Sequence, residues 1–281
     1  MKYFFAKELP VSLPYCLQTL QNVLFYVCEG IMKKEILTKI QCLTSSNNPK
    51  EAVKLAENSY KKYKDNCFLN EILKIHEKAK NRKSAIKILL KMLKSEKNNI
   101  NLIKKLATNY FYTQQYKQAL KYYKIVLECE PASSQNNFNI ACTYDFLKDY
   151  KNAELYYSRA VSLDSKNISA LNNLGLVFYN TKQYGKAIKI FKSAIGKAPN
   201  HPEAYHHMGL VNREYLKDYE LSVLYYQKAR RLDPKHIENT YQLALSYLKY
   251  DKPEKAKIEF ENCIKMNPNH KRALEQLSRL K

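Results

Sequence analysis

A unit of 34 residues recurs through most of this 281-residue chain, and its clearest copy covers residues 168–201. In this copy Leu171, Leu174, Gly175 and Phe178 are spaced i, i+3, i+4 and i+7. That spacing places all four residues on one face of an α-helix, which has about 3.6 residues per turn. The first half of the unit is therefore predicted to be an amphipathic helix.

The second half of the unit has the same periodicity. Ala187, Phe191 and Ala194 are spaced i, i+4 and i+7, and Pro199 follows them. Proline lacks the amide hydrogen that a helix interior uses, so it marks the end of this second helix. Because residues 180–184 between the two patterns are polar and suited to a turn, the unit predicts a helical hairpin.

Four further copies repeat the small residue, the aromatic residue and, in most cases, the proline. The five predicted units are residues 100–133, 134–167, 168–201, 202–236 and 237–270. Small side chains are expected where the two helices of a unit cross, because close packing leaves no room there; they are Gly175, Gly209, Ala119, Ala153, Ala187 and Ala256. In residues 202–236 the second-helix pattern comes one position late, which predicts a one-residue insertion near residues 216–219.

This pattern resembles the tetratricopeptide repeat, whose period is also 34 residues. The resemblance covers residues 100–270 and implies an all-α fold. That fold is a right-handed α-solenoid of stacked helix-turn-helix repeats, in which each repeat packs only on its neighbours. Members of the family bind peptides or partner domains in the concave surface lined by their first helices, and the resemblance implies no cofactor.

Two segments beside these units fit the same architecture. Residues 32–99 are predicted to hold two degenerate repeats, with Ala52 and Ala85 at the small-residue positions. Residues 271–281 have apolar residues at first-helix spacing but no second helix, so they are expected to form a C-terminal capping helix. Terminal repeats are commonly atypical because one of their sides has no neighbour.

The first residues, 1–31, are predicted to form an amphipathic helix that packs on the solenoid. Its apolar positions alternate in steps of four and three; they are Leu13, Leu17, Leu20, Leu24, Val27 and Ile31. Ser12 and Pro14 suit its start and Gly30 its end. The segment is too polar to span a bilayer, and we do not expect a secretory signal because Lys7 and Glu8 interrupt the apolar run. A helix lying on a membrane surface is the alternative.

The formal net charge of +22 raises the question of an anionic partner. Such a charge attracts nucleic acid, anionic lipid or acidic proteins over long range. However, the chain has only seven arginines against forty-one lysines, and arginine is preferred for bidentate recognition of phosphate and guanine. The lysines of the second helices fall away from the packing face. We therefore interpret them as a solvated surface, and nucleic acid is not the expected partner.

The residue types that carry catalysis or bind metals form no constellation in this sequence. Seven cysteines include no CxxC pair, which favours free thiols in a reducing, cytoplasmic setting. The clustered His201, His206 and His207 have no ligand partner at a metal-binding spacing except Glu203. Phosphate-binding loops and catalytic motifs are missing. We therefore expect no enzyme, no metal site and no cofactor.

The sixth residue of each first helix is predicted to point to the inner surface of the solenoid. In chain order these residues are Lys105, Asn139, Asn173, His207 and Gln242. The preceding, fifth residues add Lys104, Phe138, Asn172, His206 and Tyr241. Asparagine and glutamine offer both donors and an acceptor to a peptide backbone. The ten residues are thus predicted to line a partner-binding groove.

The ligand expected for this groove is an internal extended segment of a protein. The carboxylate clamp found in some family members fits poorly, because Lys104 and Asn139 match it but Thr108, Ser169 and Asn173 do not. The predicted function is a non-catalytic scaffold or adaptor for protein interaction. Two alternatives stay open: a basic adaptor for nucleic acid or anionic membrane, with peripheral membrane association, and a non-catalytic subunit of an enzyme complex. The sequence does not indicate an oligomeric state.

Overall fold

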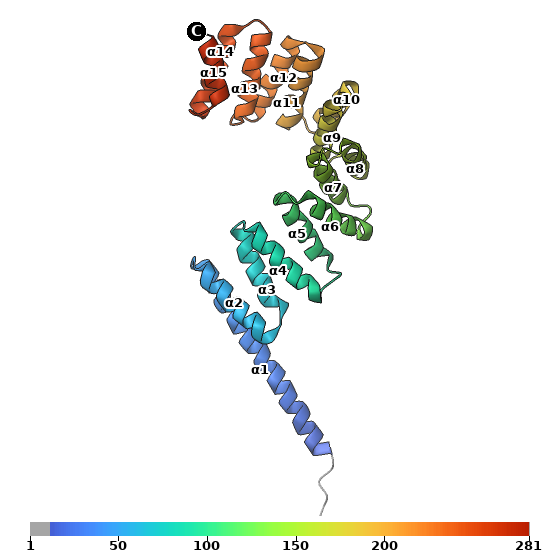
Figure 1. The fold of residues 1–281 in the computed structure, drawn as a ribbon, viewed down its shortest axis with the longest axis vertical. Coiled ribbons are helices and arrows are strands. Elements are labelled where there is room, and N and C mark those ends of the chain that lie inside the picture. Colours follow the sequence, from blue (N-terminus) through green and yellow to red (C-terminus); the bar gives the residue numbers. More distant parts are fainter. Residues whose placement is uncertain (1–11, 281) are drawn as a thin grey trace, which may run out of the picture. The chain divides into compact units, whose positions relative to one another are not determined.

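The structure is a computed structural model that describes the backbone of residues 12–280 and the side chains of residues 23–280 (Figure 1). Within this range it contains fifteen α-helices, one π-helical turn and no strand. The helices are α1 (Ser12–Ser45), α2 (Pro49–Tyr63), α3 (Asn66–Lys78), α4 (Arg82–Ser95), α5 (Ile100–Tyr112), α6 (Tyr116–Cys129), α7 (Ser134–Phe146), α8 (Tyr150–Leu163), α9 (Ile168–Asn180), α10 (Tyr184–Lys197), α11 (Pro202–Val211), α12 (Tyr219–Leu232), α13 (Ile237–Lys249), α14 (Pro253–Met266) and α15 (Lys271–Arg279), and the π-helical turn is η1 (Asn212–Leu216). The fold is all-α, a solenoid of stacked helical hairpins, as the sequence predicts.

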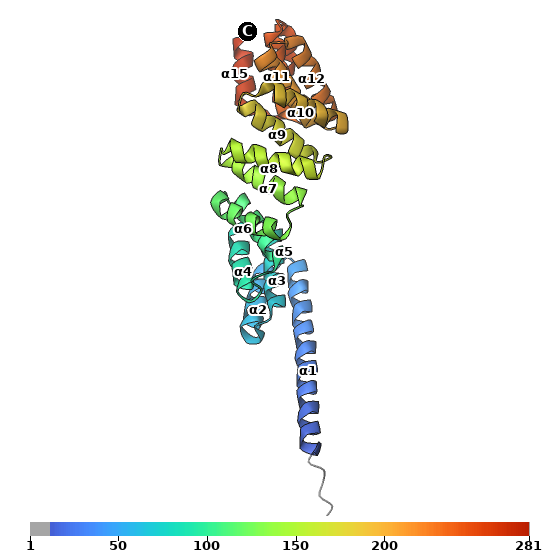
Figure 2. The ribbon, with the colours of Figure 1, turned by 90° about the vertical axis from the view of Figure 1, so that its right-hand side faces the viewer.

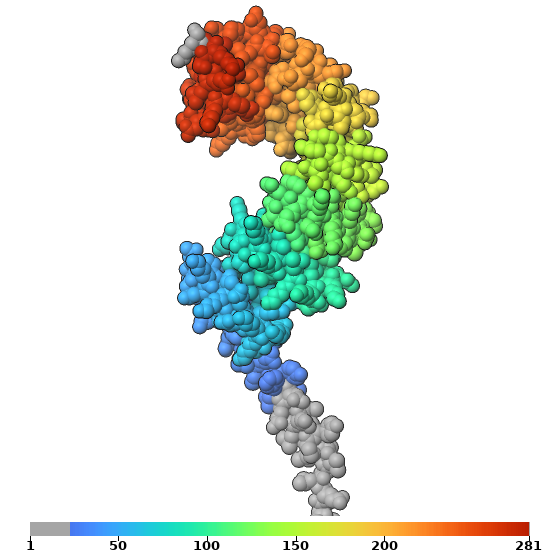
Figure 3. All heavy atoms as spheres, in the orientation of Figure 1, coloured from blue at the N-terminus to red at the C-terminus, as the bar shows by residue number. Residues whose placement is uncertain are grey.

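The chain divides into two compact units, Met1–Thr113 and Gln114–Lys281. The boundary falls between α5 and α6, inside the predicted repeat of residues 100–133. The hairpin of that repeat therefore stays a prediction. The colour bars of Figures 2 and 3 locate each unit by residue number.

The first unit is built on the two degenerate repeats. Helices α2, α3, α4 and α5 pack in sequence order, each against the next. Ala52 and Ala85 are fully buried, as expected for the small positions of second helices. The apolar residues Leu69, Ile72 and Leu89 are buried with them, so the weak pattern in residues 32–99 still encodes helix packing.

Helix α1 differs from the predicted N-terminal helix, because it continues through Gly30 to Ser45. A glycine inside a helix costs only about 1 kcal/mol relative to alanine. Helix α1 packs against α2 and α3, and its residue Ile40 is fully buried, which favours continuation of the helix past Gly30. Val23, Phe25 and Tyr26 are more than half exposed. Residues 23–32 therefore do not pack on the solenoid, and this corrects the predicted packing for that part of the helix. Residues 1–11 of the predicted segment lie outside the described range.

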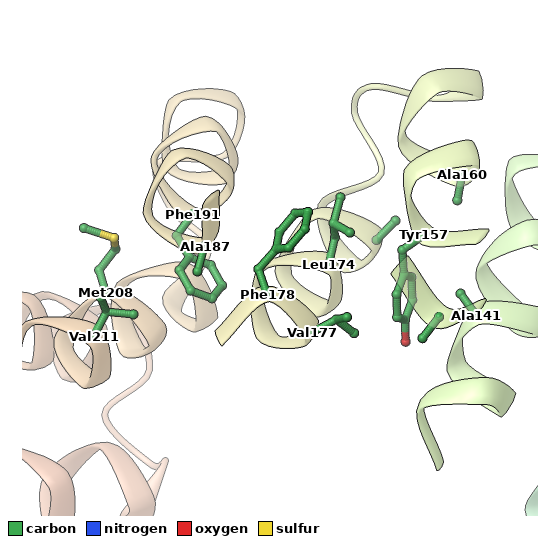
Figure 4. Packing of buried hydrophobic residues seen from close by; sticks show 12 residues of the cluster. Ala141, Tyr157, Ala160, Leu174, Val177, Phe178, Ala187, Phe191, Met208 and Val211 are labelled. Atoms are coloured by element: carbon green, nitrogen blue, oxygen red, sulfur yellow. The ribbon is translucent and has the colours of Figure 1, made fainter. Parts of the chain in front are cut away.

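The second unit stacks the hairpins α7–α8, α9–α10, α11–α12 and α13–α14 in chain order, and α15 lies against α14. Its largest core cluster runs from α7 to α11 (Figure 4). Aromatic side chains of second helices, Tyr157 and Phe191, fill the space beside small residues of first helices. A second cluster around Phe260 joins α12 to α15. Each core is thus shared between neighbouring hairpins, as in a repeat protein.

The turns of the hairpins have a common geometry. The residues Gln114, Lys148, Lys182, Lys217 and Asp251 all have φ between 54° and 62°. They are 34 residues apart except for the step from Lys182 to Lys217, which is 35. The extra residue is absorbed by η1, a π-helical turn at the end of α11. An inserted residue commonly appears as such a π-bulge, so the predicted insertion is confirmed at residues slightly before the expected turn.

Candidate partner-binding groove

The helices α7, α9, α11 and α13 form one face of the second unit, called here the first-helix face. Successive first helices contact each other directly at α7–α9 and α9–α11. Asn139, Asn173, His207 and Gln242 occupy the same position on these four helices, and all four are half-buried. Phe138, next to Asn139, is also half-buried, and its ring centroid lies 5.8 Å from that of Tyr157.

The amides of this face have few hydrogen-bond partners in the protein. Asn139 Oδ1 accepts a hydrogen bond from Gln135 Nε2 at 2.9 Å. Asn173 Nδ2 donates to the thiol sulfur of Cys142, at 3.8 Å, and the Asn173 side chain also interacts with the hydroxyl of Tyr157. Sulfur is a weak acceptor, so the bond to Cys142 leaves Asn173 weakly held.

A pocket of about 340 Å³ opens at the α9–α11–α13 part of the first-helix face. Its lining residues come from three first helices and from the connection between α12 and α13; they are Asn173, Pro202, Glu203, His206, His207, Asp233, His236, Glu238 and Asn239. This pocket brings together three of the residues predicted from sequence, Asn173, His206 and His207. Its volume lies at the small end of the range for ligand pockets, about 300–1,000 Å³.

Two histidines of the pocket, His206 and His207, have lowered pKa values and so favour their neutral form. His206 Nδ1 lies 2.6 Å from Asn239 Oδ1, and burial is the main cause that lowers the His206 pKa. Burial, with a smaller contribution from His206, lowers the pKa of His207 to about 3. Nδ1 of His207 is buried and has no hydrogen-bond partner among the described residues. At neutral pH the two rings therefore offer acceptors and carry no charge.

Three carboxylates surround these histidines. Glu238 is paired with Arg272, whose Nη2 lies 2.6 Å from Glu238 Oε2. Burial raises the pKa of Glu238, but the hydrogen bond from Gln242 and the charge of Arg272 outweigh it and lower the pKa overall. Glu203 and Asp233 have no lysine or arginine partner in the described part of the chain. The pocket is consequently acidic, although the chain as a whole is strongly basic.

Four of the predicted groove residues lie elsewhere. Asn172 and Tyr241 are only 1% and 5% exposed, because contacts with the following repeat bury them: Asn172 Nδ2 donates to Glu203, and Tyr241 packs on His270. This corrects their assignment as partner contacts. Lys104 and Lys105 belong to α5 of the first unit.

Lys105 has a partner inside its own unit. Its Nζ lies 3.1 Å from Glu77 Oε1 of α3. This ion pair accounts for the charge of Lys105 within the first unit, and neither Lys104 nor Lys105 contributes to the pocket.

The sequence prediction missed the acidic part of the pocket. Glu203, Glu238, Asp233, His236 and Asn239 line it but were not in the predicted groove. One signal was present: Glu203 and Glu238 are both the second residue of their first helices. Asp233 and His236 gave no such signal, since they lie in the connection between α12 and α13.

Neither a metal-binding cluster nor a membrane-spanning helix is present among the described residues. No group of three or more His, Cys, Asp or Glu side chains within them has a metal-binding arrangement. Among the helices of the described range, none has the length and apolar character needed to cross a membrane.

Two family profiles match parts of the sequence. The profile described as "Tetratricopeptide repeat" matches residues 238–270. The profile described as "Anaphase-promoting complex, cyclosome, subunit 3" matches residues 147–221. No curated protein matches the chain.

Several solved structures share the fold. A tetratricopeptide repeat protein from Parabacteroides merdae is 16% identical, with a TM-score of 0.67, and the match covers 88% of this chain and 98% of that one. The C-terminal part of a repeat-containing protein from Cytophaga hutchinsonii is 18% identical, with a TM-score of 0.63 and coverage of 86% and 99%. YrrB, described as a TPR protein with an unusual peptide-binding site, is 20% identical, with a TM-score of 0.51 and coverage of 66% and 96%. The repeated hairpins, the repeat profile and these solved structures together identify the chain as a tetratricopeptide-repeat protein.

Proposed function

We propose that this protein is a non-catalytic scaffold that binds an extended segment of a partner protein along the first-helix face of its second unit. One observation carries the proposal: Asn139, Asn173 and His207 occupy the same position on consecutive first helices and are half-buried. A row of polar side chains at this spacing suits a peptide backbone, whose amide groups both donate and accept. The peptide-binding site named for the structurally similar YrrB supports the same kind of ligand.

The alternatives fit the local charge less well. Glu203 and Asp233 next to the groove would repel a phosphate backbone or an anionic membrane. The lysines that dominate the net charge are exposed on second helices; examples are Lys117, Lys121, Lys124, Lys186, Lys189 and Lys192. A subunit of an enzyme complex remains compatible with the proposal, because such a subunit would also bind a protein. Six described cysteines are free, which agrees with a cytoplasmic adaptor.

The test is a double substitution, Asn139→Ala with Asn173→Ala. The partner is first captured with the wild-type chain as bait and then purified, and its affinity for each variant is measured by calorimetry. Loss of two hydrogen-bonding amides is expected to weaken binding by about 1–3 kcal/mol while the melting temperature stays the same. Gln118→Ala on α6, whose side chain is exposed, is the matched control and should bind normally. Full-strength binding by the double variant would rule out this groove.

A further inference from the structure

We propose that the pocket between α11 and α13 receives an arginine side chain of the bound segment. This inference rests on the proposed function, since the pocket adjoins Asn173 and His207 of the first-helix face. The first-helix face contacts the backbone of the bound segment, and the pocket in addition requires an arginine in the sequence of the partner. The chemical class of the ligand is a guanidinium group.

The first argument is charge. The pocket contains the carboxylates of Glu203 and Asp233, and no lysine or arginine of the described range pairs with either. The imidazole Nδ1 of His201 lies 3.9 Å from Glu203 Oε2. The arginines near the pocket already have partners: Arg272 pairs with Glu238, and Arg213 donates to Glu214 and to the carbonyl of Gln242. Two carboxylates without a lysine or arginine partner thus give the pocket a negative charge in a chain of formal charge +22. A cationic ligand group is the complement of this arrangement.

The second argument is the number and kind of acceptors. Since Asn239 Oδ1 only accepts, a proton on Nδ1 of His206 makes their 2.6 Å hydrogen bond and leaves Nε2 of the ring as an acceptor. Nδ1 of His207 is buried without a partner, although the residue lines the pocket. Buried polar atoms in proteins normally have a partner, so this nitrogen is an unused acceptor in a residue that lines the pocket.

The third argument selects arginine over lysine. The acceptors come from different directions, since Glu203 and His206 lie on α11 and Asp233 follows α12. A guanidinium group has five donors in a rigid planar fork, whereas an ammonium group is a compact point charge with three. A planar donor group can therefore reach carboxylates and imidazole together. The volume of about 340 Å³ is large enough for a side chain but small for an extended ligand.

The test uses the full chain and a small probe, so that it does not depend on knowing the partner. N-acetyl-arginine N-methylamide is titrated at neutral pH and physiological salt, and the ring signals of His206 and His236 are followed by NMR. The citrulline analogue, which has the same shape without the charge, is the comparison ligand. We expect the arginine probe to shift both rings in a saturable way and the citrulline probe to leave them unchanged.

Two pairs of substitutions sharpen the test. Glu203→Gln with Asp233→Asn should weaken binding of the arginine probe roughly tenfold, because charge-assisted hydrogen bonds are lost. Glu128→Gln with Glu261→Gln changes the net charge by the same amount at exposed positions of α6 and α14, and should bind like wild type. Glu203→Gln alone serves if the double variant unfolds, since Glu203 is exposed. Equal responses to both probes, no response to either, or equal loss in the control pair would overturn the inference.

The outcome is separable from that of the proposed function. The single variant Asn139→Ala, whose residue is not part of the pocket lining, tests backbone binding and should keep its affinity for the arginine probe if the pocket binds arginine. If that variant binds the partner normally while the arginine probe still binds the pocket, the groove assignment fails and the pocket stands. If the partner requires Asn139 and Asn173 but the arginine probe leaves the histidines unchanged, the pocket assignment fails and the groove stands.

Discussion

Glycine is required at two crossing points of the second unit. A β-carbon built on Gly175 would overlap the ring of Phe191, and one built on Gly209 would lie 2.8 Å from the ring of Tyr226. These aromatic side chains fill the core beside the crossings, so they have little room to move. These short distances give the steric reason why the repeat pattern has a small residue at each crossing.

Substitution of Gly175 tests this close approach. Gly175→Leu should lower the free energy of unfolding by at least about 1–3 kcal/mol, because it overpacks the crossing. Urea denaturation followed by circular dichroism measures the change. Gly185→Leu in the adjacent helix α10 is the matched control, since nothing lies within 4 Å of a β-carbon there. Equal stability of Gly175→Leu and wild type would show that the helices do not pack in this register.

Stability should also depend on pH through His207. Its folded-state pKa of about 3 is below the usual value of 6.5, so the unfolded chain binds the proton more readily. The stabilisation by the neutral ring is then fully present above pH 6.5 and is lost as the pH falls toward 3. Between pH 6.5 and pH 5 this predicts a loss of up to about 2 kcal/mol.

The control for this prediction is His207→Gln, which removes the titrating group. Thermal melts at pH 7.5 and pH 5 should show a smaller decrease for the variant than for wild type. A decrease of the same size in both proteins would assign the pH dependence to other groups.

At the scale of the element, each hairpin turn places a non-glycine residue in the left-handed region. Lys148, Lys182 and Lys217 have φ of 62°, 61° and 58°. Glycine is common at this position after a helix because it has no β-carbon to strain. The sequence has no glycine at these turn positions. The helices nevertheless end at well-defined residues, because the packing of the two helices against each other determines the turn.

The cost of this turn geometry can be measured at Lys182, an exposed residue. Lys182→Gly should raise the free energy of unfolding by up to about 1 kcal/mol, because the left-handed conformation costs a residue with a β-carbon roughly 1–2 kcal/mol and part of the gain is lost to the unfolded chain. Lys182→Val should lower it by a similar amount, since β-branched residues tolerate positive φ poorly. Differential scanning calorimetry compares the two variants with wild type. The opposite order of stability would contradict a left-handed turn residue.

The one irregular element follows from local sequence. In the hairpin that contains η1, the buried polar residue Asn212 takes the place of the aromatic residue found in other repeats, and its Nδ2 donates to the Met208 carbonyl at 2.7 Å. Arg213 is buried beside it and lies over the Tyr226 ring. The π-helical turn thus accommodates the extra residue and turns Arg213 toward the repeat that follows, where it donates to the Gln242 carbonyl.

At the scale of the whole molecule, the charge is unevenly distributed. The formal charge of +22 arises mostly from lysines, and those of the second helices are exposed. The pocket on the first-helix face of the second unit has the opposite sign. The exposed lysines therefore attract polyanions over long range, whereas the pocket selects a cationic side chain. The two effects act at different surfaces of the same protein.

This distribution predicts weak, salt-sensitive binding to nucleic acid. Fluorescence anisotropy with a labelled DNA duplex should detect binding at 50 mM salt that does not depend on sequence. Neutralising six or more phosphates would cost on the order of a thousandfold in affinity between 50 and 200 mM salt, so binding should vanish near physiological salt. Micromolar binding that persists there would restore nucleic acid as a principal partner.

The sequence by itself determined the hairpins from α7 to α14, the small residues at Gly175 and Ala187, and the inserted residue before α12. These features depend on periodicity within a single repeat, and they recur often enough to be recognised. The sequence pattern does not predict that α1 continues through Gly30, because one glycine only weakly favours a helix end, whereas packing that buries Ile40 favours continuation.

Only the tertiary structure decided which residues form a site. Asn173, His206 and Asp233 are 27 to 60 residues apart in sequence and meet at one pocket because consecutive hairpins stack. The same stacking buries Asn172 and Tyr241, which sequence position alone placed in the groove. The repeat period can be read from the sequence because it arises from contacts inside each hairpin. The pocket instead arises from contacts between hairpins. There, adjacent residues of one helix, such as Asn172 and Asn173, point in different directions, so one is buried and the next is accessible.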